Sequence, residues 1–121
     1  MPLKKILLVD DSATERHVIG EMLKKNGYDV VFAVSGEDGI VKSKSERPDL
    51  IVMDVVMPGL NGFQACRTIT QDAETKQIPV ILCTTKNQQT DKIWAIRQGA
   101  KDYVTKPVDA AELLGKIAAQ G

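Results

Sequence analysis

Three carboxylates, a hydroxyl and an ammonium stand where apolar runs of the sequence end, and together they could handle a phosphoryl group. Asp10 and Asp11 follow the first run, and Asp54 follows the third. Thr84 follows the fourth run and Lys106 follows the last. Clustered carboxylates repel one another unless a cation lies among them, and hard oxygen ligands in this number suit Mg²⁺. We therefore expect a magnesium site formed by these residues.

Asp54 is the strongest candidate for a nucleophile in this set. In phosphoryl transfer the protein mainly positions groups and neutralises charge on the phosphoryl oxygens, and a carboxylate can itself form an acyl phosphate. Lys106 could pair with a carboxylate or with a phosphoryl oxygen, and the Thr84 hydroxyl could donate to the same group. Taken singly, each residue could instead be a turn residue, a helix cap or a solvated charge, so the prediction depends on their convergence.

The elements that would bring these residues together are five apolar runs alternating with helical patterns. The runs are nearly continuous rather than alternating, which indicates strands buried on both faces of a parallel sheet. We predict strands at 6–9, 30–33, 50–53, 80–83 and 103–104, and helices at 12–27 and 35–46, around 63–69 and 93–96, and after Asp109. This (βα)₅ order predicts a doubly wound α/β fold with a five-stranded parallel sheet. Ligands in such folds lie at the carboxyl ends of the strands.

Composition narrows the classes of function. The chain has 121 residues, and sixteen Lys and Arg balance sixteen Asp and Glu, which argues against a nucleic-acid or anionic-membrane binder. No apolar run approaches the roughly 20 residues that span a bilayer, so we expect a cytoplasmic protein without membrane insertion. Cys66 and Cys83 match no zinc or redox spacing, and we predict buried, reduced thiols.

The whole chain resembles the response-regulator receiver domains of the CheY-like type. Residues 9–12 (VDDS) resemble the acidic pair of that family, and residues 54–62 (DVVMPGLNG) resemble its phosphoacceptor loop. Thr84 and the Lys106-Pro107 pair complete the pattern. The resemblance implies a flavodoxin-like (CheY-like) receiver fold in which residues 1–121 form one receiver domain. It also implies a signalling protein that is not an enzyme and that carries no output domain.

The resemblance assigns a role to each acidic residue. Asp54 would accept the phosphoryl group from a partner histidine kinase of the chemosensory, CheA-like kind. Asp11 and Asp54 would bind Mg²⁺ through their side chains, Asp10 would help mainly through water, and Val56 would supply its backbone carbonyl.

The resemblance also implies a conformational switch. Thr84 and Lys106 would contact the phosphoryl oxygens, and Tyr103 would be the aromatic residue that turns inward when Thr84 moves. The face formed by the fourth helix, the fifth strand and the fifth helix would then present a changed surface to an effector or motor-associated protein. The Lys106-Pro107 bond would be cis, and the receiver would act as a monomer or weak dimer.

A closer resemblance covers residues 57–108, which are similar to the stand-alone PilH-type regulators of the type IV pilus chemosensory pathway. This resemblance implies control of twitching motility. Trp94 in this stretch is either a partner anchor or a residue packed against its neighbours. Thr85 is larger than the family usually has, and we hypothesise that Val56 and Lys86 set the lifetime of the phosphoryl group.

The residues of the site argue against two other classes of function, and two further readings are kept as alternatives. A phosphatase with an Asp nucleophile usually needs a second carboxylate two residues later, where this chain has Val56. A flavin-binding domain would need a Ser/Thr-rich phosphate loop where this chain has Asp10 and Asp11. The chain could also be a phosphate sink for a sister regulator or an interaction module that is never phosphorylated.

Overall fold

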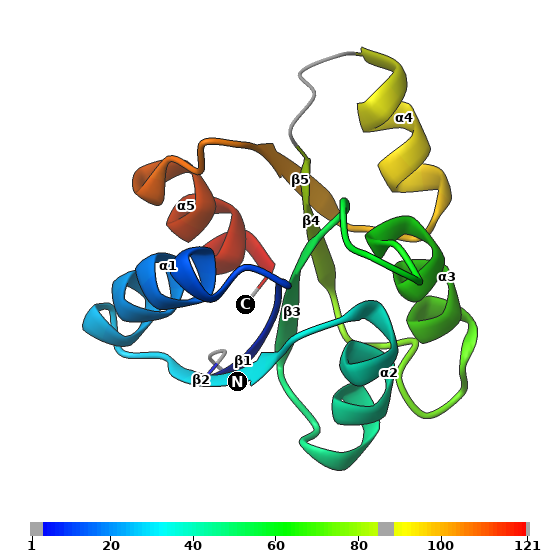
Figure 1. The fold of residues 1–121 in the computed structure, drawn as a ribbon, viewed down its shortest axis with the longest axis horizontal. Helices are drawn as coiled ribbons and strands as arrows, with labels where there is room; N and C mark the ends of the chain where they lie inside the picture. Colours follow the sequence, from blue (N-terminus) through cyan, green and yellow to red (C-terminus); the bar gives the residue numbers. More distant parts are fainter. Residues whose placement is uncertain (1–3, 85–88, 121) are drawn as a thin grey trace.

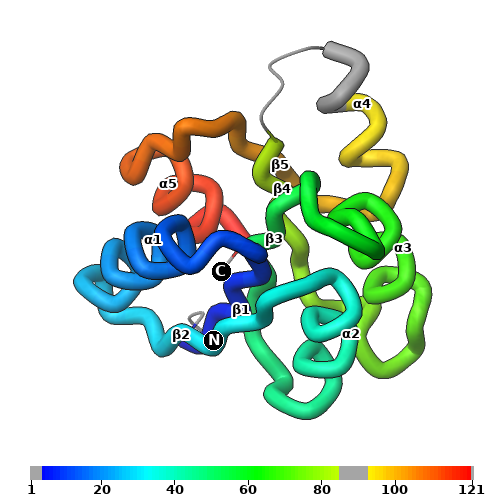
Figure 2. Tube along the Cα trace, in the orientation of Figure 1, coloured from blue at the N-terminus to red at the C-terminus, as the bar shows by residue number. Residues whose placement is uncertain are grey.

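Strands and helices alternate along the chain, as Figure 1 shows for a computed structural model. The structure describes residues 4–84 and 89–120, with the side chains of residues 4–84 and 93–120. The elements are β1 (Lys5–Val9), α1 (Ala13–Lys25), β2 (Asp29–Ala33), α2 (Gly36–Ser45), β3 (Leu50–Asp54), α3 (Gly62–Gln71), β4 (Val80–Thr84), α4 (Gln89–Arg97), β5 (Asp102–Thr105) and α5 (Ala110–Gln120). Figure 2 follows the trace from β1 in blue to α5 in red.

The strands form one parallel sheet in the order β2-β1-β3-β4-β5. Helices α1 and α5 cover one face of the sheet, and α2, α3 and α4 lie on the other (Figure 1). The predicted five-stranded, doubly wound α/β fold is therefore confirmed. From β1 the chain first adds β2 on one side and then β3, β4 and β5 on the other, so the order reverses between β1 and β3. Folds of this kind bind ligands at that position.

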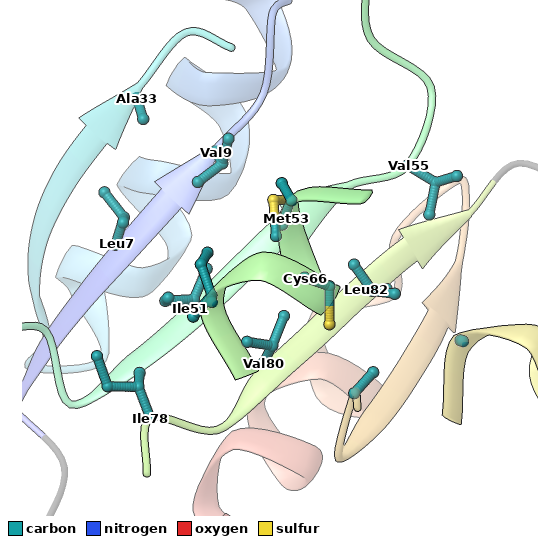
Figure 3. Packing of buried hydrophobic residues seen from close by; sticks show 14 of the residues in the cluster. Leu7, Val9, Ala33, Ile51, Met53, Val55, Cys66, Ile78, Val80 and Leu82 are labelled. Carbon is teal, nitrogen blue, oxygen red and sulfur yellow. The ribbon is translucent and has the colours of Figure 1, made fainter. Parts of the chain in front are cut away.

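The core consists of two layers, one on each face of the sheet. Successive side chains of a strand point to opposite faces, so Leu7 joins the layer under α2 and α3 while Leu8 joins the layer under α1 and α5. Figure 3 shows the first layer, in which Met53 and Leu82 from the strands pack with Cys66 of α3. Burial on both faces explains why the central strands β1, β3 and β4 are almost continuously apolar, whereas the edge strands β2 and β5 are partly exposed.

The helices begin at polar residues that cap them. Ser12 and Ser35 accept hydrogen bonds from backbone N–H groups of α1 and α2, and Asn61 with Gln64 forms a capping box at α3. The fourth helix differs from the expected pattern, because Ile93 and Ile96 are exposed. The described part of α4 instead buries Ala95. None of the helices in the described ranges is long and apolar enough to cross a membrane.

The strands run one or two residues further than the apolar runs predict. β3 includes Asp54 and β4 includes Thr84, so both residues belong to the sheet rather than to the loops that follow it. The backbone ladder therefore fixes their positions, and the loop after β3 turns closely over Asp54. At Gly62 a Cβ atom would lie 2.2 Å from the Asp54 carbonyl oxygen, so only glycine fits there without a shift of the backbone.

Candidate functional site

The parallel register brings Asp10, Asp54 and Lys106 to the carboxyl edge of the sheet. Val9 pairs with Met53, so Asp10, which directly follows β1, lies at the same level as Asp54 at the end of the neighbouring strand β3. Lys106 follows β5, and its backbone N–H donates to the carbonyl of Thr84 at 2.7 Å. The predicted convergence of these residues is thus present in the structure.

Lys106 is surrounded by carboxylates. Its Nζ atom lies 3.1 Å from Asp54 Oδ1 and 3.4 Å from Asp10 Oδ2, and it also forms an ion pair with Glu15 Oε2. Only 13% of the Lys106 side chain is exposed, against 5% for Asp54 and 3% for Asp10. The ammonium therefore neutralises part of a negative cluster in which Asp10 and Asp54 are buried from water.

Glu15 is the site residue that the sequence analysis missed. It lies in the first turn of α1, three residues after the cap Ser12, where an acidic residue is ordinarily explained as a helix-start signal. Its side chain instead reaches Lys106. The spacing could have identified Glu15 as a site residue. Glu15 stands one helical turn beyond the acidic pair and so lies over the same sheet edge.

Burial and the local charges shift the pKa values of the cluster. Burial raises the pKa of Asp10 to about 6 and also raises the pKa of Asp54, although the Lys106 charge opposes both shifts. Burial alone would lower the pKa of Lys106, but its contacts with Glu15 and Asp54 outweigh burial and raise it. The hydrogen bond with Lys106 lowers the pKa of Glu15.

The same cluster fits a hard divalent cation. Within the described part of the chain, carboxylate oxygens of Asp10, Glu15 and Asp54 lie within 4.8 Å of one another. Asp54 Oδ1 is buried without a hydrogen-bond partner among the described residues, since its contact with Lys106 is an ion pair of poor hydrogen-bond geometry. A buried carboxylate oxygen in this state can accept a cation.

Two of the predicted metal ligands are not part of this oxygen cluster. Asp11 is exposed, and among the described residues it does not join the group that could hold a metal. Val56 is 63% exposed, and its expected contribution is a backbone carbonyl. The metal-binding roles of both residues stay predictions.

The two predicted switch residues lie on neighbouring strands. Thr84 is buried at the end of β4 and pairs with Thr105 of β5. Tyr103 is partly buried and packs against the core layer under α2 and α3. Lys116 of α5 donates a hydrogen bond to the Tyr103 carbonyl, and its Nζ lies 4.9 Å from the centre of the Tyr103 ring. The Lys106-Pro107 bond is cis, as the resemblance implies.

Other predicted features fall outside the acidic cluster. Trp94 is 48% exposed and packs edge-on against Phe63 of α3, with 6.3 Å between ring centroids. Thr85 and Lys86 lie outside the described residues. Both cysteines are free and buried, as predicted.

A comparison with known protein families identifies the family of the chain. The family model described as the response regulator receiver domain matches residues 6–118. The chain belongs to the response regulator receiver family. Receiver domains are signalling modules, and the acidic cluster described above is the place where such a domain is expected to bind Mg²⁺.

Individual relatives agree with this assignment. The receiver is 56% identical to protein PilH of Pseudomonas aeruginosa over 115 residues, which is 95% of each chain. It spans only 51% and 48% of two longer curated relatives, which are transcriptional regulatory proteins of Streptomyces coelicolor and Bacillus subtilis.

Solved structures show the same receiver fold. The chemotaxis protein CheY4 of Vibrio cholerae matches with a TM-score of 0.91 and 28% identity, over 98% of this chain and 99% of that one. The receiver domain of the sensor histidine kinase PA1611 of Pseudomonas aeruginosa matches with a TM-score of 0.88 and 32% identity, over 97% and 96%. That structure has a magnesium ion coordinated in its active site cleft.

Proposed function

We propose that this receiver is phosphorylated on Asp54 by a partner histidine kinase. A carboxylate oxygen of Asp54 would attack the phosphorus of a phosphohistidine, and the P–N bond would break with its electron pair left on the imidazole nitrogen. The product is an acyl phosphate on Asp54 and a neutral histidine after proton uptake. The observation that carries the proposal is the buried Asp54 carboxylate, held at the sheet edge 3.1 Å from the Lys106 ammonium.

Positive charge at this edge supports the transfer. Asp10, Asp11 and Asp54, with the Val56 carbonyl, would hold Mg²⁺, which supplies charge that offsets the phosphoryl oxygens. Lys106 is a second, fixed cation, and its low exposure strengthens its electrostatic effect. Thr84 ends the strand next to Asp54, where its hydroxyl could donate to a phosphoryl oxygen.

We also propose that the signal leaves through the face formed by α4, β5 and α5. A phosphoryl group adds charge and acceptor atoms near Thr84 and Lys106, so the loops after β4 and β5 should rearrange. Tyr103 of β5 is tied to α5 by Lys116, which contacts both its carbonyl and its ring. A movement of Tyr103 would therefore change the β5-α5 surface that a protein partner meets.

The likeness to PilH supports a role in type IV pilus or chemotaxis-like motility control. In this proposal the kinase is of the chemosensory, CheA-like kind, and the receiver acts in the cytoplasm as a stand-alone protein, without binding nucleic acid. The effector would be a protein of the motility machinery that recognises the phosphorylated surface.

The direct test is intact mass after incubation with a small phosphodonor and Mg²⁺. We expect one added phosphoryl group on the wild-type protein and none on Asp54→Asn. Trp94, the only tryptophan, lies on α4 and provides a second readout, because with Mg²⁺ already present its emission should change on phosphorylation of the wild type and stay constant in Asp54→Asn. Failure of the wild-type protein to gain mass, or an adduct that survives Asp54→Asn, would disprove the proposal.

A further inference from the structure

Lys106 has three N–H groups, and three carboxylates compete for them. Glu15 accepts one hydrogen bond, Asp10 accepts a longer one at 3.4 Å, and Asp54 Oδ1 lies 3.1 Å away as an ion pair. Of these carboxylates, Glu15 alone comes from a helix rather than from a strand end. A phosphoryl oxygen on Asp54 that needs Lys106 therefore meets an ammonium that is already engaged.

The start of α1 explains why Glu15 is free to reach this position. In a capping box, the acidic residue three positions after the cap would accept from the cap backbone N–H. Here the N–H of Ser12 donates to Asp10 Oδ1 at 2.9 Å, so Asp10 takes that place. Ser12 Oγ still accepts from the Glu15 backbone N–H, which fixes the first turn. The Glu15 carboxylate is released from capping and turns toward Lys106.

We propose that Glu15 is a positioning residue that holds Lys106 in the unphosphorylated receiver and biases the site toward a cation and against a phosphoryl group. The inference rests on the proposed phosphorylation of Asp54. Glu15 contributes a third negative charge within 4.8 Å of the oxygens of Asp10 and Asp54. That charge attracts a divalent cation, and it both repels the phosphoryl oxygens and competes with them for Lys106.

The proposal predicts effects of opposite sign when the charge is removed. Two unit charges separated by 4.8 Å, the span of the carboxylate oxygens, would change a binding constant by roughly three-hundredfold at an effective dielectric constant near 20. The Glu15 side chain is 39% exposed, so solvent screening reduces the expected effect to about three- to tenfold. Glu15→Gln should weaken Mg²⁺ binding by that factor and strengthen binding of a phosphoryl mimic by a similar one.

Calorimetric titrations of the full chain can test both effects without measuring phosphorylation. The first titrates Mg²⁺ into the metal-free protein, and the second titrates beryllium fluoride at saturating Mg²⁺. Glu21→Gln is the matched control, because it removes one carboxylate from the same helix, where Glu21 pairs only loosely with Lys24 at 3.9 Å. Thermal unfolding followed by circular dichroism verifies that each variant is folded.

Opposite shifts in Glu15→Gln, with Glu21→Gln within twofold of the wild type in both titrations, would support the proposal. Mg²⁺ and beryllium fluoride affinities of Glu15→Gln that match the control would overturn it, and so would two shifts in the same direction. The proposed function fails separately, if the wild-type protein gains no phosphoryl mass. The Mg²⁺ titration still reports on Glu15 in that case.

Discussion

The buried charge on Asp10 should make the metal-free receiver less stable than a variant that lacks it. Burial raises the pKa of Asp10 from 3.8 to about 6, a shift of about two units. At 1.36 kcal/mol per unit, ionised Asp10 costs up to about 3 kcal/mol of folding free energy at neutral pH. The side chain is 3% exposed, so solvent screening does not reduce this value.

Asp10→Asn keeps the shape of the side chain and removes the charge. The Asn Oδ1 can still accept the 2.9 Å hydrogen bond from Ser12, whereas the amide nitrogen would face the Lys106 ammonium unfavourably. We therefore expect a net gain of about 1–3 kcal/mol in the free energy of unfolding at pH 7.5. For a domain of this size that corresponds to a rise of about 4 °C in Tm per kcal/mol.

The pH dependence of this gain provides a sharper test. Well below pH 3.8 the Asp10 carboxyl is protonated in both the folded and unfolded chains. Its charge then contributes no difference in the free energy of unfolding between the wild type and Asp10→Asn. Between about pH 4 and 6 the folded protein retains a proton on Asp10 that the unfolded chain has lost, so the contribution of Asp10 to the stability of the wild type falls as pH rises. The advantage of Asp10→Asn should thus be small at pH 4 and complete above pH 7.

Urea denaturation in EDTA at pH 4, 5.5 and 7.5 measures the effect. Asp29→Asn is the control, because it removes an exposed carboxylate at the start of β2. A variant no more stable than the wild type at pH 7.5, or one whose advantage is the same at all three values, would refute the reasoning.

Three further predictions concern the metal, the glycines and the cysteines. Mg²⁺ at 100 times its Kd should stabilise the wild type by about 2.7 kcal/mol, and Asp10→Asn by much less, as thermal unfolding with and without EDTA would show. Gly62→Ala should destabilise the protein by about 1–3 kcal/mol, because the new Cβ meets the Asp54 carbonyl oxygen. Gly115→Ala in α5 should stabilise it by about 0.5–1 kcal/mol, because its new Cβ meets no atom of another element within 4 Å. Equal changes of the two variants in urea denaturation would contradict this. Burial raises the pKa of both Cys66 and Cys83 to about 12, so neither thiol should react with Ellman's reagent at pH 8 until the protein unfolds, and rapid labelling of the native state would contradict it.

Much of the fold could be predicted because local chemistry and global position agree. Strands buried on both faces must be continuously apolar, so short apolar runs that are bounded by turn residues and separated by helical patterns indicate the strands. The buried side of the fourth helix could not be predicted, because Ile93 and Ile96 fit a helical period yet are exposed. Spacing identifies a helix, but it does not say which side the core occupies.

At the acidic edge, too, some features could be predicted from the sequence and others only from the structure. Because all strands are parallel, the residues that end them must meet at one edge, and the sequence alone therefore places Asp10, Asp54 and Lys106 together. Glu15 belongs to no strand end, and its type and position are those of an ordinary helix start. Its carboxylate reaches Lys106, while Asp10 accepts from the Ser12 backbone N–H that Glu15 would bind in a capping box. The sequence determined which chemistry gathers at the edge, and the tertiary structure decided how those charges are paired, since pairing depends on distances between elements that no local pattern encodes.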